Sequence, residues 1–164
     1  MLRYADRMLG YVIIIASVVA FVAIGLLWLF RSKRTSFTLP LGVRVTPLPG
    51  QMIDEEARDQ INQAYREALV FWNRHSPMHG RDIQFAVATA TLRFVRRPIK
   101  RGDQRAAAVT TGNSTLCYWP TGESTDWLYR VLRHEAGHVA INAMWGPKGT
   151  GNAHALMQES GFGL

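Results

Sequence analysis

The residues of this 164-residue chain best suited to chemistry lie in one short run, Arg133-His134-Glu135-Ala136-Gly137-His138-Val139. Two histidines four residues apart lie one turn apart on the same face of a helix, so both imidazoles point toward one place. Two neutral imidazoles at this spacing can bind one zinc ion. Glu135 lies about 100° around the helix, within reach of a water on the ion. The spacing therefore predicts a zinc site with His134 and His138 as ligands and Glu135 as general base.

The flanking sequence predicts a buried helix that carries this motif. Ser124, Thr125 and Asp126 are N-cap candidates, and Gly146-Pro147 is a stop signal. Apolar residues fall on both sides of the expected helix, at Trp127, Val131, Ile141 and Trp145 on the histidine side and at Leu128, Leu132, Ala136, Val139 and Ala143 opposite. Such a helix is buried, and its imidazoles then need a polar partner. A metal ion would be that partner, and the alternative is a simple hydrogen bond to a carbonyl group.

The charge is strongly basic but gives no sign of a nucleic-acid surface. The formal net charge is +7 and the sequence pI is about 10.2. The densest basic runs, 31–34 and 93–105, have no interleaved aromatic pattern, so no nucleic-acid partner is expected. A single cysteine, Cys117, excludes an internal disulfide and is expected to be a small core residue.

An uncharged apolar run covers residues 9–30. About 22 residues at ~1.5 Å each reach ~33 Å, enough to cross the hydrocarbon core of a bilayer. The run ends without a small-x-small cleavage site, which favours a retained anchor over a signal peptide. We therefore expect a tail over 1–8, a single transmembrane helix over 9–30 in the lipid bilayer, and an extended Pro- and Gly-rich linker over 31–51.

Residues 52–164 predict a small α+β domain with a mixed sheet. An amphipathic helix is expected over Ile53–His75. Alternating apolar residues predict strands around Ile83, Phe85 and Val87 and around Leu92 and Phe94, with a basic loop over 98–105. Two more short strands are expected over 106–111 and 114–119, joined by the turn dipeptide Gly112-Asn113. After the motif helix, a glycine-rich loop over 146–151 leads to His154, Met157 and Glu159.

The order of these elements around His134-Glu135-x-x-His138 resembles the zincin metallopeptidases, over the chain from Ile53 onward. Within zincins, Ala155-Leu156-Met157 after a candidate histidine is similar to the methionine turn of the metzincins, especially the matrixin-like ones. The resemblance implies that Met157 supplies this turn. It also implies that the strand at 106–111 is an edge strand that pairs with an extended peptide substrate.

The third metal ligand departs from the metzincin pattern. Metzincins usually have Gly three residues after the second histidine and the third histidine three residues beyond that, where this chain has Ile141 and Met144. His154 is the preferred substitute. Glu159 is the alternative third ligand, since a glutamate some twenty residues past the motif resembles the gluzincin arrangement.

Two functions are expected from this combination. The first is a membrane-anchored zinc metallopeptidase that hydrolyses peptide or protein substrates with zinc-activated water, Glu135 being the general base. Secreted relatives of the fold favour an extracytoplasmic domain, against a weak charge signal. The alternative is a non-catalytic accessory or structural subunit of a membrane or virion complex, built on a degenerate zincin-like domain with other membrane subunits as partners.

Overall fold

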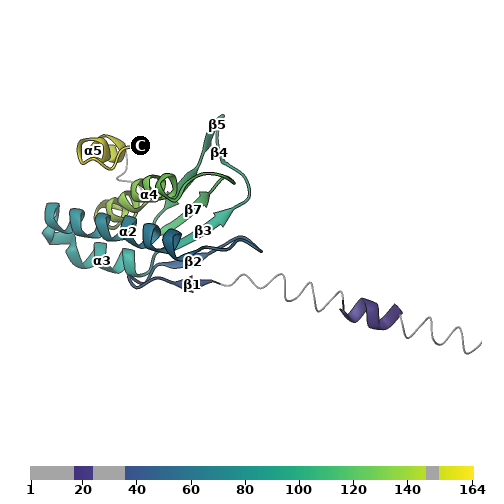
Figure 1. Cartoon of the computed structure of the whole chain (residues 1–164). Coiled ribbons are helices and arrows are strands. Elements are labelled where there is room, and N and C mark those ends of the chain that lie inside the picture. The colour runs from purple at the N-terminus through teal and green to yellow at the C-terminus, as the bar shows by residue number, and fades with distance from the viewer. Residues whose placement is uncertain (1–16, 24–35, 147–151) are drawn as a thin grey trace, which may run out of the picture. The chain divides into compact units, whose positions relative to one another are not determined.

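The computed structural model describes residues 17–23, 36–146 and 152–164 (Figure 1). The chain divides into two units, Met1–Arg34 and Thr35–Leu164, and each is described by itself. In the first unit, residues 17–23 are helical. No helix in the described part of the chain is long and apolar enough to cross a membrane. The transmembrane helix predicted over 9–30 is corrected on this finding. Its residues 9–16 and 24–30, like the predicted tail over 1–8, lie outside the described residues.

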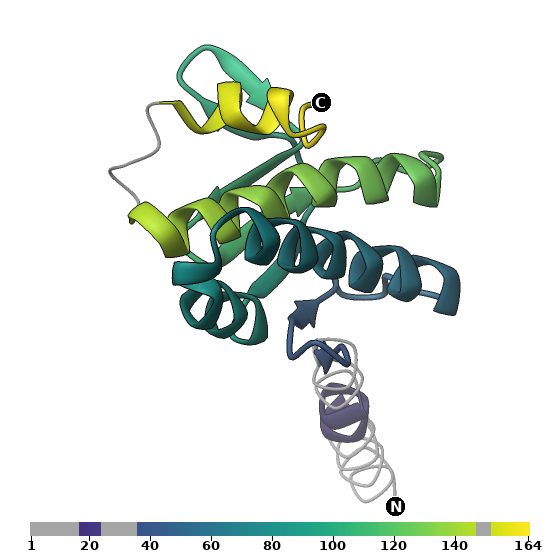
Figure 2. The ribbon, with the colours of Figure 1, turned by 90° about the vertical axis from the view of Figure 1, so that its left-hand side faces the viewer.

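The second unit is α+β, as predicted, with a mixed five-stranded sheet in the order β1-β2-β3-β7-β6. Its strands are β1 (Phe37–Thr38), β2 (Arg44–Thr46), β3 (Thr91–Val95), β6 (Ala108–Thr111) and β7 (Ser114–Tyr118). The pairs β2–β3 and β3–β7 are parallel, and β1–β2 and β6–β7 are antiparallel. Alternate residues of β3 and β7 are buried, so one face of the sheet is apolar. Helices α2 (Glu55–His75), α3 (Gly80–Ala88) and α4 (Thr125–Trp145) cover that face (Figures 1 and 2).

The residues of β1 and β2 belong to the segment that the sequence analysis assigned to a linker. They are instead part of the sheet, because β2 pairs with β3 in the register Val45↔Leu92. Val43 and Val45 are fully buried. The turn between the strands passes so close to the end of α3 that only a glycine fits, at Gly42 with φ +94°.

Helix α2 (Glu55–His75) matches the predicted amphipathic helix. Asp54 is its N-cap, with Oδ1 accepting from the Ala57 amide at 2.9 Å. Its apolar stripe is buried, at Ala57, Ile61, Ala64, Tyr65, Ala68 and Trp72. This stripe packs against α4, the helix that carries the histidine motif.

Residues 80–88 form a helix, α3 (Gly80–Ala88), and not the predicted strand. It follows a single 3-10 turn over Pro77–His79. Ile83 and Val87 are buried, whereas Phe85 is 70% exposed. The spacing of four between the two buried residues belongs to a helix, and the alternation that indicated a strand counted the exposed Phe85 as a core residue.

The segment around the predicted basic loop is a β-hairpin. Strands β4 (Ile99–Arg101) and β5 (Gln104–Ala106) pair with each other in a separate two-stranded sheet, which stands out from the main sheet (Figures 1 and 2). The hairpin leads directly into β6. Because β6 ends the strand order, the prediction of an edge strand at this position is confirmed.

Candidate metal centre

Helix α4 (Thr125–Trp145) holds the histidine motif and begins and ends at the predicted signals. The Ser124 hydroxyl accepts from the Trp127 amide at 3.1 Å, and Gly146 is the C-cap with φ +71°. The helix is buried on both sides between α2, α3 and the sheet, as predicted. Its side chains are therefore held by packing on several elements, which fixes the direction of both imidazoles.

Three imidazoles converge beside α4. His134 and His138 come from α4, and His154 comes from α5 (Ala153–Glu159). Their ring centroids lie 4.9 Å (His134–His138), 5.4 Å (His134–His154) and 4.9 Å (His138–His154) apart. One nitrogen from each ring lies within 4.8 Å of the other two, so the three histidines can hold a metal ion. In the described part of the chain they are the one group of three or more His, Cys, Asp or Glu residues arranged in this way.

The donor geometry suits a small divalent ion. Nitrogens ~2.0–2.1 Å from a tetrahedral zinc ion lie roughly 3.3–3.4 Å from one another. Nε2 of His154 lies 3.1 Å from Nε2 of His138, close to that separation. When both rings are neutral, two facing nitrogens this close have room for only one proton between them. When both rings are charged, they repel each other. A cation between them would satisfy both lone pairs.

The ring of His134 is oriented by a main-chain group. Its Nδ1 lies 2.8 Å from the carbonyl oxygen of Phe162, and because a carbonyl only accepts, Nδ1 must donate. The proton on Nδ1 leaves Nε2 with its lone pair free for a metal. Outer hydrogen bonds of this kind fix the tautomer and direction of histidine ligands in metal sites.

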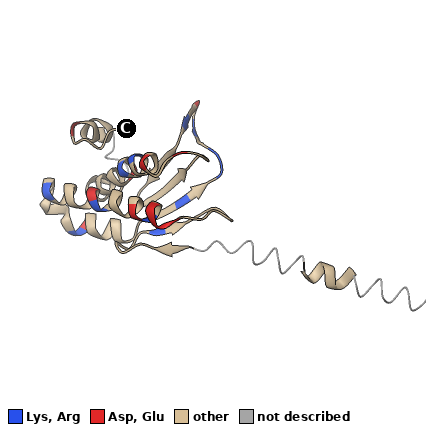
Figure 3. Ribbon diagram, viewed as in Figure 1, with Lys and Arg blue, Asp and Glu red and all other residues tan. Residues whose placement is uncertain are grey.

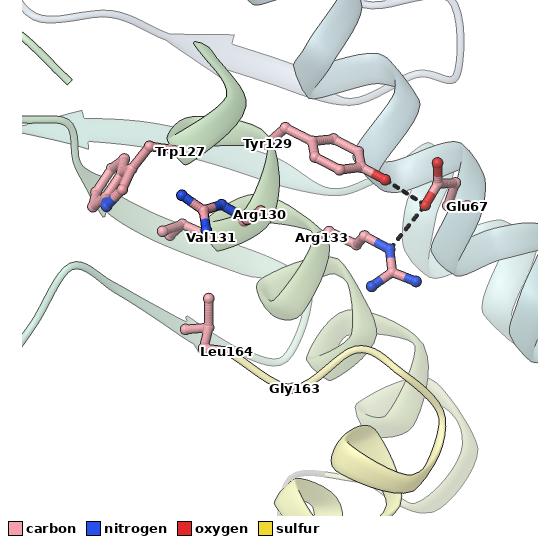
Figure 4. Close-up of a pocket in the computed structure, with 8 residues that line it drawn as sticks. All are labelled: Glu67, Trp127, Tyr129, Arg130, Val131, Arg133, Gly163 and Leu164. Atoms are coloured by element: carbon pink, nitrogen blue, oxygen red, sulfur yellow. Dashed lines mark hydrogen bonds and ion pairs between the residues drawn. The ribbon is translucent and has the colours of Figure 1, made fainter. Parts of the chain in front are cut away.

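The segment that supplies this carbonyl is itself clamped to α4 and α2. The Arg133 guanidinium lies 4.0 Å from the centroid of the Phe162 ring, and its Nη1 donates to the Gly161 carbonyl. Arg133 Nε also donates to Glu67 of α2 at 2.8 Å, and the Tyr129 hydroxyl donates to the same carboxylate at 2.6 Å (Figure 4). Arg133, which directly precedes His134 in the chain, therefore holds the Gly161-Phe162 segment that orients the His134 ring.

The Glu135 carboxylate lies in the same region but has an incomplete set of partners. The residue is 5% exposed, and its Oε2 is buried with no hydrogen-bond partner among the described residues. Burial raises the pKa of Glu135 above its ordinary value, and a hydrogen bond from Thr110 and the nearby His154 and Arg101 offset part of this effect. A raised pKa makes this carboxylate a better proton acceptor than an exposed one, and its free oxygen leaves room for the proton.

His138 is kept neutral by its surroundings. Burial lowers the pKa of His138 to about 4, helped by the positive charge that His134, His154 and Arg101 can carry. A neutral imidazole is the form that binds metal. The His138 ring is therefore already in the ligand form at neutral pH.

Met157 lies in α5 and not in a turn as the resemblance implied. Its side chain is fully buried, and a Cβ built on Gly137 would lie 2.9 Å from its methyl carbon. The small residue between the two α4 histidines thus lets α5 approach α4. Glu159, the alternative third ligand, is exposed at the far end of α5 and does not belong to the metal-binding group.

A cleft of about 790 Å³ opens over the histidines and Glu135. The edge strand β6 borders it, together with Arg101 and Gln104 of the hairpin and Asn142 of α4. Thr110 of β6 donates from Oγ1 to the Glu135 carbonyl at 3.4 Å, which ties the edge strand to the motif helix. The cleft therefore offers an unpaired strand edge beside a potential metal ion.

Comparison with protein-family models, with curated proteins and with solved structures gives no match for this chain. All three histidines and Glu135 were predicted from the sequence, whereas Phe162 and Arg101 were not. Phe162 contributes a main-chain oxygen, which has no sequence signal. The basic run around Arg101 was visible in the sequence but was predicted only as a loop.

Proposed function

We propose that this domain is a zinc-dependent metallopeptidase with Glu135 as general base. The observation that carries the proposal is the convergence of three imidazoles beside a buried carboxylate with a free oxygen, in a cleft bordered by an unpaired strand edge. Three neutral imidazoles form a common ligand set of catalytic zinc. When bound, zinc would supply Lewis-acid polarisation of a water and of a peptide carbonyl.

Residues of the chain would bind the substrate and transfer the proton. An extended peptide would add to β6 through main-chain hydrogen bonds, as strands do at an exposed edge. Glu135 would accept the proton of the attacking water at its free Oε2 and deliver it to the leaving amine. The hydrogen bond from the Thr110 hydroxyl to the main-chain carbonyl of Glu135 would tie the motif helix to the strand that binds the peptide.

The decisive experiment compares Glu135→Gln with the wild type. The amide keeps the size of the side chain but cannot take a proton, so we expect peptide cleavage to fall by roughly 10²–10⁴-fold with zinc still bound. Glu159→Gln is the matched control, because it makes the same chemical change on exposed α5 and should leave cleavage unchanged. Zinc content is measured on the purified variants, and cleavage is measured with and without a chelator.

Undiminished cleavage by Glu135→Gln would exclude Glu135 from the reaction. Zinc binding by a wild-type protein that cleaves no peptide would favour the second function, a domain in which the metal has a structural role in an accessory subunit. The incomplete resemblance around Ile141 and Met144 gives that alternative its support.

A further inference from the structure

The β4–β5 hairpin places unpaired positive charge at the edge of the cleft. Arg101, Gln104 and Arg105 line the same cleft as the histidines, and all three are exposed. Figure 3 shows basic residues along this hairpin, with an acidic residue at its tip. Among the described residues the ion pairs are His79–Asp82 and Arg133–Glu67, so neither arginine of the hairpin has an acidic partner there.

The register of the hairpin separates its basic residues into two faces. Arg101 is directly opposite Gln104, and Lys100 is directly opposite Arg105. Opposite residues share a face and successive residues alternate between faces. Arg101 and Gln104 therefore project from one face, and Lys100 and Arg105 from the other. Lys100 is not among the residues that line the cleft, whereas Arg105, on the same face but nearer to β6 in the chain, does line it.

The charge of Arg101 reaches the metal centre. Arg101 lines the same cleft as His138 and Glu135. A ligand bound in that cleft would therefore lie within range of its charge.

We propose that Arg101, with Gln104 beside it, binds a carboxylate of the substrate, so that the cleft selects acidic peptides. This inference rests on the proposed peptidase function. A guanidinium offers paired donors that match the two oxygens of a carboxylate, and the Gln104 amide can add one more. An aromatic residue on which a base could stack is absent from the hairpin sequence 96–106, so a carboxylate fits these groups better than a nucleic acid does.

The direction of β6 predicts on which side of the scissile bond the acidic residue of the substrate lies. The hairpin leads into the start of β6, so Arg101 lies toward the Ala108 end of the edge strand. A peptide that pairs antiparallel with β6 reaches that end with its carboxyl-terminal portion. We therefore expect the preferred Asp or Glu to follow the scissile bond.

Binding can be measured without cleavage. The full chain carrying Glu135→Gln is loaded with zinc, and two fluorescent peptides that differ by one Glu→Gln change after the scissile position are compared by anisotropy. We expect roughly tenfold tighter binding of the acidic peptide, the size of one charge-assisted interaction. Added salt should reduce the preference.

Three added substitutions test the assignment. Arg101→Ser should abolish the preference while binding of the neutral peptide persists, and Lys100→Ser should retain it, although both remove one positive charge from the same strand. Arg101→Lys should keep only part of the preference, because a lysine lacks the paired donors. Thermal unfolding of each variant checks that it is folded.

The inference is overturned if the two peptides bind equally, if Lys100→Ser and Arg101→Ser lose the preference to the same extent, or if a short oligonucleotide of equal charge binds more tightly than the acidic peptide. Its failure is separable from that of the proposed function. Cleavage without an acidic preference would remove the inference alone, and an Arg101-dependent preference in a protein that cleaves nothing would remove the peptidase alone.

Discussion

His134 donates from Nδ1 to the main-chain carbonyl of Phe162 at 2.8 Å, while the Phe162 side chain lies buried beside Arg133. Phe162 thus orients the His134 ring with its main chain and anchors itself with its own ring. The orientation of His134 therefore depends on apolar packing 28 residues away in sequence.

Replacing Phe162 with Ala should weaken both the fold and the metal site. Phe162 is 1% exposed, and truncating such a ring costs roughly 3–5 kcal/mol. Without its ring, residue 162 would no longer hold its carbonyl against His134, so zinc affinity should also fall by roughly 10–100-fold, as for other changes to groups that orient metal ligands. Chelator competition measures the affinity, and urea unfolding without metal measures the stability. Leu164→Ala, on an exposed neighbour, should change neither quantity. Unaltered zinc affinity in folded Phe162→Ala would contradict the orienting role.

Met157 and Gly137 should show strong coupling. Met157→Ala should cost roughly 2–5 kcal/mol, because it leaves a cavity between α5 and α4. Gly137→Ala alone should be close to neutral, since a helix-propensity gain of about 1 kcal/mol is opposed by a Cβ that would lie 2.9 Å from the Met157 methyl carbon. In the Met157→Ala background that conflict is gone, so the same change should stabilise by about 1 kcal/mol. A double-mutant cycle by urea unfolding measures the difference, and additive effects would argue against the contact.

Helices α2 and α4 and the centre of the site could be predicted from sequence because their signals are local. Asp54 and Ser124 cap their helices, and His134 and His138 share a face through a spacing of four. The missed parts depend on partners distant in sequence. β2 has only three residues and becomes a strand by pairing with β3, and α3 is so short that Ile83, Phe85 and Val87 also fit the period of a strand.

Two residues were predicted as alternatives for the third ligand, and packing brings one of them, His154, to the other two histidines. His154 and Glu159 lie at opposite ends of α5. The contact of Met157 with Gly137 docks the helix so that its beginning faces the histidines. Local sequence contains no information about this docking, because it is a property of the interface between α5 and α4.

Glu67 should make stability depend on pH in the acidic range. Burial acts to raise its pKa, but hydrogen bonds from Tyr129, Gln63 and Arg133 outweigh this and lower the pKa below its ordinary value of 4.5. A group with a lowered folded pKa stabilises the fold above its unfolded pKa, and this contribution is lost as the pH falls through the folded pKa. The stability difference between wild type and Glu67→Gln should therefore be constant above about pH 5.5 and shrink in more acidic solution. Urea unfolding over a pH series measures it, and a difference that grew on acidification would refute the assignment.

Gly42 should be far less tolerant of substitution than Gly50, although both have positive φ, +94° and +80°. A Cβ at Gly42 would lie 2.4 Å from the Ala88 carbonyl oxygen, whereas one at Gly50 would meet nothing within 4 Å. Gly50→Ala should cost about 1–2 kcal/mol from backbone strain alone, and Gly42→Ala should cost clearly more. Thermal unfolding compares the two. Equal effects would mean that the segment before α2 is not packed against α3 as the structure has it.

The division of the three imidazoles between α4 and α5 has a consequence for how the last helix is retained. An ion bound by all three imidazoles would hold α5 on α4, because its binding energy would add to the apolar packing of Met157 against Gly137. Stripping the ion would then loosen α5 first and leave the sheet as it was. The availability of metal would thus change how stably α5 is docked.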